Sequence, residues 1–151
     1  MKIGFVSSSG GHWEELMCLM TLGEKYDVFY VTEKGGQSDE AFVKPIYALN
    51  QINRHEKDFV FRFFKLFFQA KRILKFEQPD IIITTGALIS FPFCLLAKMK
   101  GKKIVYIESF ARIHDKSLTG RLVYPFADLF LVQWEEMVKV YPKAEFVGSI
   151  F

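Results

Sequence analysis

With 151 residues, the chain has the length of a single domain and is long enough to bury a hydrophobic core. Apolar residues make up 50% of the sequence and aromatic residues 17%, including 17 phenylalanines, and this composition excludes a disordered chain. The formal net charge of +3 gives no indication of nucleic-acid binding, so we expect no such partner.

Strand and helix patterns alternate along the whole chain. We expect strands at residues 3–6, 27–32, 45–48, 80–84, 103–107, 128–132 and 145–147, and helices at about residues 13–25, 58–76, 90–100, 117–126 and 135–141. The apolar runs 81–83 and 129–132 are continuous, as in parallel strands that are covered on both faces. The chain is therefore predicted to be one α/β domain, residues 1–151, with a doubly wound, mostly parallel, Rossmann-like sheet that binds ligands at the carboxyl ends of its strands. Residues 33–42, which include Gly35 and Gly36, are the expected mobile loop.

Cysteine usage and hydropathy indicate the compartment. Cys18 and Cys94 lie inside apolar helical patterns without CxxC spacing, which favours buried free thiols over a metal site or a disulfide. No signal-peptide pattern precedes the first strand, and no apolar stretch reaches the ~18 uncharged residues of a membrane span. We therefore expect a cytosolic topology.

The most specific motif is Ser9-Gly10-Gly11-His12, between the first predicted strand and the first predicted helix. Glycines let backbone N–H groups come close to an anion, and a helix N-terminus favours phosphate. The imidazole of His12 at the mouth of such a turn can transfer a proton or hydrogen-bond a sugar. A Gly-Gly turn can also serve close packing alone, so both interpretations are open.

Other strand ends carry residues that this topology brings to the same edge of the sheet. Gly86 follows the strand at 80–84 and leads towards Ser90, a candidate N-cap. Glu108 and Arg112 follow the strand at 103–107 and either pair with each other or contact a substrate. Trp134 follows the strand at 128–132 and is either a core ring or an interface anchor.

The helix at 58–76 combines many phenylalanines with a narrow polar stripe formed by Arg62, Lys65, Gln69 and Arg72. A helix that covers a sheet needs an apolar face only somewhat over 100° wide, so part of this aromatic surface needs another contact. An aromatic body with cationic flanks suits an anionic membrane surface, and the alternative is a neighbouring subunit. The predicted membrane-contact residues are Phe59, Arg62, Phe63, Phe64, Lys65, Phe67 and Phe68.

These motifs together resemble the membrane-associated subunit of a split GT-B glycosyltransferase. The most specific stretches are SGGH at 9–12 and YIESFAR at 106–112, with further matches at 117–120, 133–134 and 147–151, so the resemblance covers essentially the whole chain. Similar proteins are the bacterial capsule and exopolysaccharide "beta-1,4-galactosyltransferase enhancer" group. The eukaryotic counterpart anchors the UDP-N-acetylglucosamine transferase of the dolichol pathway.

The resemblance implies that this chain is the N-terminal, acceptor-side half of a GT-B enzyme. A separate catalytic subunit would bind the UDP-sugar, and galactose or N-acetylglucosamine would pass to a lipid-diphosphate-linked sugar in polysaccharide biosynthesis. The chain would be peripheral on the cytoplasmic face of the plasma membrane, attached through the phenylalanine-rich helix. No cofactor and no metal is expected, since no acidic metal motif is present and such chemistry uses helix dipoles and basic groups.

The resemblance also implies roles for particular residues. His12 is the first candidate for the base that deprotonates the acceptor hydroxyl, and Glu108 is the second. The implied substrate-binding residues are Ser9, Gly10, Gly11, Gly86, Ser109 and Arg112. The implied partner-binding residues are Trp134, Gly148, Ile150 and Phe151.

Two other classes of function compete with this interpretation. A complete small nucleotide-binding enzyme would need a full GxGxxG fingerprint and an acidic ribose contact, and neither follows the first strand. A purely structural membrane scaffold would recruit a transferase without contributing catalytic residues of its own.

Overall fold

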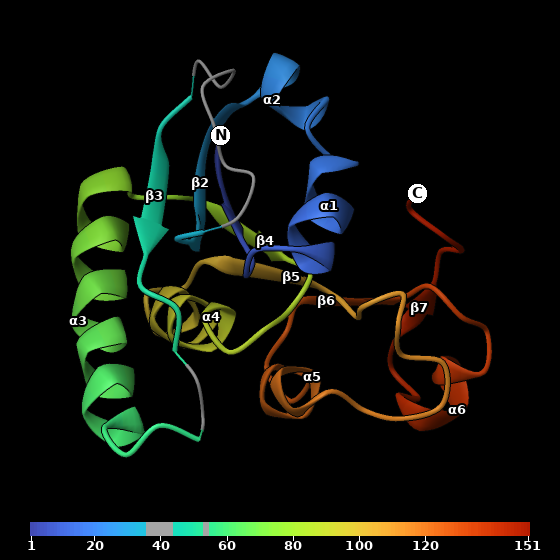
Figure 1. The fold of residues 1–151 in the computed structure, drawn as a ribbon. Coiled ribbons are helices and arrows are strands. Elements are labelled where there is room, and N and C mark those ends of the chain that lie inside the picture. Colours follow the sequence, from blue (N-terminus) through green and yellow to red (C-terminus); the bar gives the residue numbers. More distant parts are fainter. Residues whose placement is uncertain (36–43, 53–54) are drawn as a thin grey trace.

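The computed structural model describes residues 1–35, 44–52 and 55–151, which form a parallel sheet with helices on both faces (Figure 1). The strands are β1 (Lys2–Val6), β2 (Asp27–Glu33), β3 (Ile46–Leu49), β4 (Ile81–Thr84), β5 (Lys103–Ile107), β6 (Leu129–Val132) and β7 (Glu145–Phe146). Their order is β3-β2-β1-β4-β5-β6-β7, and every neighbouring pair is parallel. The part of this order from β3 to β6 is that of a doubly wound Rossmann-like sheet, so the predicted fold class is confirmed.

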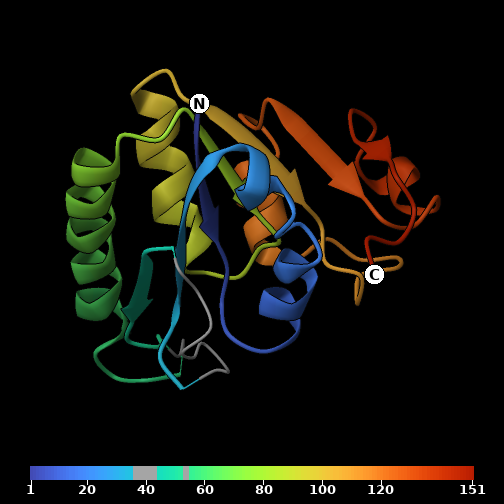
Figure 2. The same ribbon diagram turned by 90° about the horizontal axis from the view of Figure 1, so that it is seen from above.

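The helices divide between the two faces of the sheet. They are α1 (Gly11–Met17), α2 (Leu22–Lys25), α3 (Phe59–Glu77), α4 (Ser90–Met99), α5 (Leu118–Val123) and α6 (Met137–Val140). α1 and α2 cover one face, whereas α3, α4 and α5 cover the other, as two views at right angles show (Figure 1 and Figure 2). Parallel strands place all their carboxyl ends at one edge, where the loops to α1 and α4 begin.

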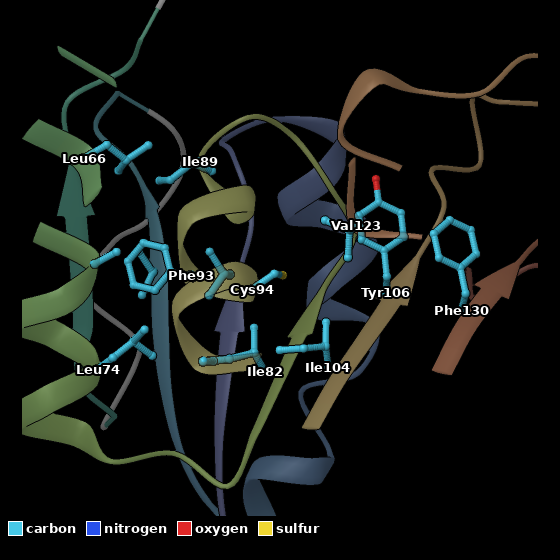
Figure 3. Close-up of a cluster of buried hydrophobic side chains, with 14 of the residues drawn as sticks. Leu66, Leu74, Ile82, Ile89, Phe93, Cys94, Ile104, Tyr106, Val123 and Phe130 are labelled. Atoms are coloured by element: carbon cyan, nitrogen blue, oxygen red, sulfur yellow. The ribbon is translucent and has the colours of Figure 1, made fainter. Parts of the chain in front are cut away.

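Side-chain alternation along the strands supplies a core on each face. Phe29 of β2 belongs to the larger cluster beneath α3 and α4, whereas its neighbour Tyr30 belongs to the cluster beneath α1. Figure 3 shows Phe93 and Cys94 of α4 among apolar side chains from α3 and from the strands. The central strands are thus buried on both faces, as continuous apolar runs predict.

Two details of the first predicted helix differ from expectation. The pattern at 13–25 forms two short helices, because the backbone N–H groups of Cys18, Leu19 and Met20 donate to carbonyls three residues back and end the α-helical pattern. Cys18 is consequently exposed, contrary to the prediction, whereas Cys94 is buried as predicted; both are free thiols.

Three further expectations need correction or completion. Ser90 is not the N-cap of α4, which is Ile89; the Ser90 hydroxyl instead points inward, accepts from Thr84 Oγ1 at 2.6 Å and donates to the Gly86 carbonyl. The run 129–132 alternates between half-buried and buried side chains because β6 lies near the edge of the sheet. Of the predicted mobile loop, Glu33 ends β2, and residues 36–42 lie outside the described residues.

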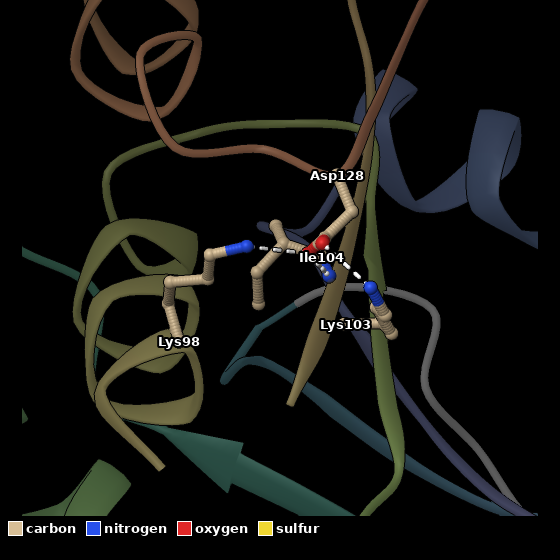
Figure 4. A network of polar contacts seen from close by, with 4 residues as sticks. All are labelled: Lys98, Lys103, Ile104 and Asp128. Carbon is tan, nitrogen blue, oxygen red and sulfur yellow. Dashed lines mark hydrogen bonds and ion pairs between the residues drawn. The ribbon is translucent and has the colours of Figure 1, made fainter. Parts of the chain in front are cut away.

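Asp128, which precedes β6, joins this strand to β5 and α4 (Figure 4). Its carboxylate accepts hydrogen bonds from Lys98 Nζ at 2.8 Å, from Lys103 Nζ at 3.1 Å and from the backbone N–H of Ile104 at 2.9 Å. Burial raises the pKa of this carboxyl, but the donors outweigh burial and lower the pKa to about 2. The network stabilises the amino end of the sheet, away from the loops described next.

Candidate functional site

A pocket of about 210 Å³ lies where the loops after β1, β4 and β5 meet. The strand order reverses between β1 and β4, which is the switch point at which doubly wound sheets bind ligands. Three residues predicted from sequence, His12, Ser109 and Arg112, line this pocket. The expectation that these distant loops converge is therefore confirmed. The lining residues that the prediction did not include in the site are Ala87, Ala111, Ser117, Leu118 and Thr119.

His12 heads α1 and is held at the pocket by the loop after β4. The hydroxyl of Thr85 donates to the backbone carbonyl of His12 at 2.7 Å. The imidazole Nδ1 is buried, and no atom of the described residues hydrogen-bonds it. Buried polar atoms are rarely left unpaired, so His12 keeps a hydrogen-bonding capacity that the described residues do not use.

Gly86 lies beneath His12 rather than on the pocket wall. It is buried with φ at +109°, and a Cβ at this position would lie 2.9 Å from Tyr106 Oη and 3.6 Å from His12 Cε1. The glycine is therefore needed for close packing of His12 and Tyr106. Direct substrate contact, which the sequence predicted for Gly86, does not fit this geometry.

Glu108 is 1% exposed, and internal donors surround its carboxylate. Oε2 accepts from Tyr141 Oη at 2.7 Å and from Ser117 Oγ at 3.1 Å, and Oε1 accepts from the backbone N–H of Ser109 at 3.2 Å. Burial and then the hydrogen bond to Glu108 raise the pKa of Tyr141. Glu108 does not line the pocket, so its geometry fits an internal support and not the predicted second base. Among the ion pairs of the described residues, none joins Glu108 to Arg112.

A second buried carboxylate, that of Glu15, was not predicted as part of the site. Its Oε1 accepts from Ser109 Oγ and from the backbone N–H of Phe110, both at 3.0 Å. Burial raises the pKa of Glu15, and the hydrogen bonds from Ser109 and Phe110 offset part of that effect. Nothing in the sequence distinguishes Glu15 from the exposed Glu14 beside it.

The glycine turn itself is open to solvent. Gly10 has φ at +76°, which favours glycine, and its carbonyl accepts from the backbone N–H groups that begin α1. A side chain at Gly10 or Gly11 would meet no described atom within 4 Å, so the turn has room for a ligand. The backbone N–H of Ser9 donates to the carboxylate of Glu33 at the end of β2, and burial raises the pKa of Glu33. The turn is therefore hydrogen-bonded to the end of β2, while its outer surface at Gly10 and Gly11 is not covered by described residues.

Residues 58–150 match the model of a protein family described as "Oligosaccharide biosynthesis protein Alg14 like". The chain belongs to the Alg14 family. The UDP-N-acetylglucosamine transferase subunit ALG14 of Mus musculus is 28% identical over an alignment of 184 residues, gaps included. The alignment covers 99% of this chain and 83% of the mouse protein. The subunit alg14 of Schizosaccharomyces pombe is 45% identical over 80 residues, which cover 50% of this chain and 38% of the yeast protein. The relation to the eukaryotic anchoring subunit is confirmed, and the resemblance to the capsule group stays an expectation.

Solved structures similar to this Alg14-family chain show its fold. Acinetobacter baumannii MurG superposes with a TM-score of 0.77 at 18% identity, covering 98% of this chain and 45% of MurG. UDP-N-acetylglucosamine 2-epimerase from Rickettsia bellii gives a TM-score of 0.74 at 16% identity, covering 99% of this chain and 45% of the epimerase. The Alg14-family chain thus spans less than half the length of these structures.

Helix α3 of this Alg14-family chain has a mixed aromatic and cationic outer face. Phe64 and Phe68 are 62% and 70% exposed, as a membrane-contact role requires, and the unpredicted Phe61 is 72% exposed. Phe63 and Phe67, predicted to face the membrane, are instead half-buried. Their rings pack on Phe91 of α4 at centroid distances of 6.5 and 6.3 Å, since α3 and α4 are neighbours.

The remaining predicted membrane residues also differ in exposure. Phe59 is half-buried and stacks on Phe63 at 5.7 Å. Arg62 is bound to Asp58 and Glu56 at 2.6 and 2.8 Å, whereas Lys65 is exposed. No helix in the described part of the chain is long and apolar enough to cross a membrane.

The C-terminal segment of the Alg14-family chain returns towards the α1 face (Figure 1). Trp134 is half-buried and donates from Nε1 to the Phe110 carbonyl at 2.7 Å, which makes it both a core ring and part of the surface. Phe151 is exposed and its ring lies 5.6 Å from that of Phe110. Gly148 has φ at +75°, and Ile150 packs on the cluster under α1. Trp134 and Phe151 thus both contact Phe110 in the loop after β5, whereas Ile150 packs on the α1 side of the sheet.

Proposed function

We propose that this chain is the acceptor-side subunit of a two-chain UDP-N-acetylglucosamine transferase. The family membership and the names of the relatives support the reaction class. The observation that carries the proposal is the pocket at the switch point, which His12 and Arg112 both line, together with the buried Nδ1 of His12, which no described atom hydrogen-bonds. Similar folds occur within chains more than twice as long, of which this chain matches 45%.

The proposed chemistry divides between the two chains. The acceptor hydroxyl oxygen forms a bond to the anomeric carbon of the donor sugar, the bond from that carbon to UDP breaks, and the hydroxyl proton passes to His12. Arg112 supplies positive charge for the diphosphate of a lipid-linked acceptor. The charge on departing UDP is stabilised by groups of the catalytic subunit.

The names of the relatives favour N-acetylglucosamine over galactose as the transferred sugar. A lipid-diphosphate-linked sugar is the proposed acceptor, and capsule or exopolysaccharide synthesis is the process implied by the resemblance. The partner docks on the surface formed by Trp134, Gly148, Ile150 and Phe151.

Membrane attachment through α3 is the second part of the proposal. The exposed rings of Phe61, Phe64 and Phe68 enter the interface of the bilayer, and the exposed cations of the helix, such as Lys65, contact anionic headgroups. The chain then lies on the cytoplasmic face of the plasma membrane, where the lipid-linked acceptor is held close to the pocket.

Reconstitution tests the proposal. The chain is assayed alone, and then with the transferase subunit that co-purifies with it, using UDP-N-acetylglucosamine or UDP-galactose and a lipid-diphosphate-linked sugar in vesicles. We expect negligible transfer by the chain alone and transfer of N-acetylglucosamine by the pair. Full activity of the isolated chain would contradict a split enzyme.

A purely structural scaffold is the second candidate. The burial of Glu108 favours it, because only one of the two predicted bases then faces the pocket. The two candidates differ in whether His12 is needed for transfer once the complex has formed.

A further inference from the structure

A line of buried hydrogen bonds joins the C-terminal segment to the pocket loops. The backbone N–H of Ile150 donates to Gln133 Oε1 at 3.1 Å. Gln133 Nε2 donates to Glu15 Oε2 at 3.4 Å and to the backbone carbonyl of Glu108 at 3.1 Å. Gln133 and Glu15 are each 4% exposed, so water does not readily replace these hydrogen bonds, and losing one of them costs free energy.

The same carboxylate holds the pocket wall. The other oxygen of Glu15 accepts from Ser109 Oγ and from the backbone N–H of Phe110, both at 3.0 Å. Ser109 lines the pocket, and its carbonyl accepts from the backbone N–H of Arg112 at 2.9 Å. Glu15 therefore fixes the turn that presents Arg112, and it lies on the same helix as His12.

The polarity of these groups allows one orientation of the Gln133 amide. Its NH2 group faces two acceptors, the Glu15 carboxylate and the Glu108 carbonyl, while its oxygen faces one donor, the Ile150 N–H. Reversing the amide would oppose donors to donors and acceptors to acceptors. The bond to Ile150 and the bonds to Glu15 and Glu108 thus depend on each other.

We propose that Glu15 and Gln133 are positioning residues that couple the seating of the C-terminal segment to the pocket wall at residues 109–112. The contact between the rings of Phe151 and Phe110, at 5.6 Å, adds a second link between the same segments. As far as it concerns a partner and an acceptor, this inference rests on the proposed function. A partner that orders the C-terminal segment then also orders the turn that carries Arg112, so the pocket is complete only in the complex.

Amide hydrogen exchange on the full chain, without substrate or partner, tests the coupling in both directions. Glu15→Gln places an NH2 group where Gln133 needs an acceptor, so we expect the Ile150 amide to exchange about tenfold faster. Ile150→Pro removes the N–H group that donates to Gln133. We then expect the Phe110 and Arg112 amides to exchange several-fold faster, because one hydrogen bond that supports their turn is weakened. Reciprocity is required of any true coupling.

Matched controls separate coupling from general destabilisation. Glu14→Gln changes the exposed neighbour of Glu15, and Ile150→Val keeps the N–H group; neither should alter exchange at the distant segment. The proposal is overturned if Ile150→Pro leaves the exchange of Phe110 and Arg112 at the level of Ile150→Val. Because residue 150 lies outside the helices and strands, the fold should tolerate Ile150→Pro, and the test stands even if Glu15→Gln does not fold.

The reconstituted pair gives a second readout. At a saturating concentration of the catalytic subunit, we expect Glu15→Gln to raise the KM for the lipid-linked acceptor about tenfold, with the KM for the UDP-sugar unchanged. An unchanged acceptor KM in a folded variant would contradict a positioning role. If the wild-type pair is inactive, the proposed function fails, and the exchange experiment alone then decides the coupling.

Discussion

The phenol of Tyr141 donates a 2.7 Å hydrogen bond to the carboxylate of Glu108, and both side chains are fully buried. A buried carboxylate needs hydrogen-bond donors, and besides Tyr141 these are the Ser117 hydroxyl and the backbone N–H of Ser109. This arrangement fixes the loop after β5 and leaves His12 as the predicted base that faces the pocket.

Removing either member of this pair should destabilise the fold. We expect Glu108→Ala to lower the free energy of unfolding by about 3 kcal/mol, because it leaves buried hydroxyls unpaired, and Tyr141→Phe to lower it by about 1.5 kcal/mol. Urea denaturation measures both changes. The double variant should lose less than the sum, since the two residues share one network. An unchanged stability of Glu108→Ala would contradict the supporting role of this carboxylate.

Arg112 is exposed at the pocket, so its loss should affect binding and not folding. We expect Arg112→Ala to raise the acceptor KM of the reconstituted pair about tenfold or more, the usual cost of one charge-assisted hydrogen bond, with the melting temperature unchanged. Arg121→Ala, an exposed arginine of α5 outside the pocket lining, is the control and should leave the KM unchanged. An equal rise of the acceptor KM in both variants would mean that the net positive charge matters and not a defined subsite at Arg112.

Membrane binding should depend on the exposed rings of α3. We expect Phe61→Ser, Phe64→Ser and Phe68→Ser, combined, to abolish sedimentation with anionic vesicles, because each buried ring contributes about 2 kcal/mol. Met99→Ser, which removes an exposed apolar side chain at the end of α4, is the control and should still sediment. If the triple variant still sediments with the vesicles, these rings do not bind the membrane, and a neighbouring subunit is then the expected partner of this face.

Asp128 should make stability depend on acid pH. Its pKa is about 2 in the folded chain, against 3.8 for the free carboxyl, so between these values the unfolded chain binds more protons. The stabilisation is present above about pH 4 and is lost as the pH falls towards 2. We expect Asp128→Asn to cost about 1–2 kcal/mol at pH 7 by urea denaturation. The difference in the free energy of unfolding between wild type and Asp128→Asn should shrink over this acid range. A constant difference would contradict the ion-pair account.

The strands, their doubly wound order and the convergence of residues 12, 109 and 112 follow from local patterns and topology. Exposure on α3 could not be predicted in the same way, because Phe91 of α4 decides which phenylalanines are covered. The burial of Glu108 likewise depends on distant groups: Tyr141 donates to it, and Gly120 leaves it room, since a Cβ there would clash with its carboxylate. Glu15 differs from Glu14 only through contacts with loops far along the chain.

The transfer rate of the reconstituted pair with His12→Ala is the most direct test of a shared site. We predict a loss of about 100-fold or more, the range for a general base, while the variant still co-purifies with its partner. His114→Ala, which alters an exposed histidine outside the pocket lining, should transfer at the wild-type rate. Undiminished transfer by His12→Ala in an intact complex would contradict the account and leave this chain as a scaffold.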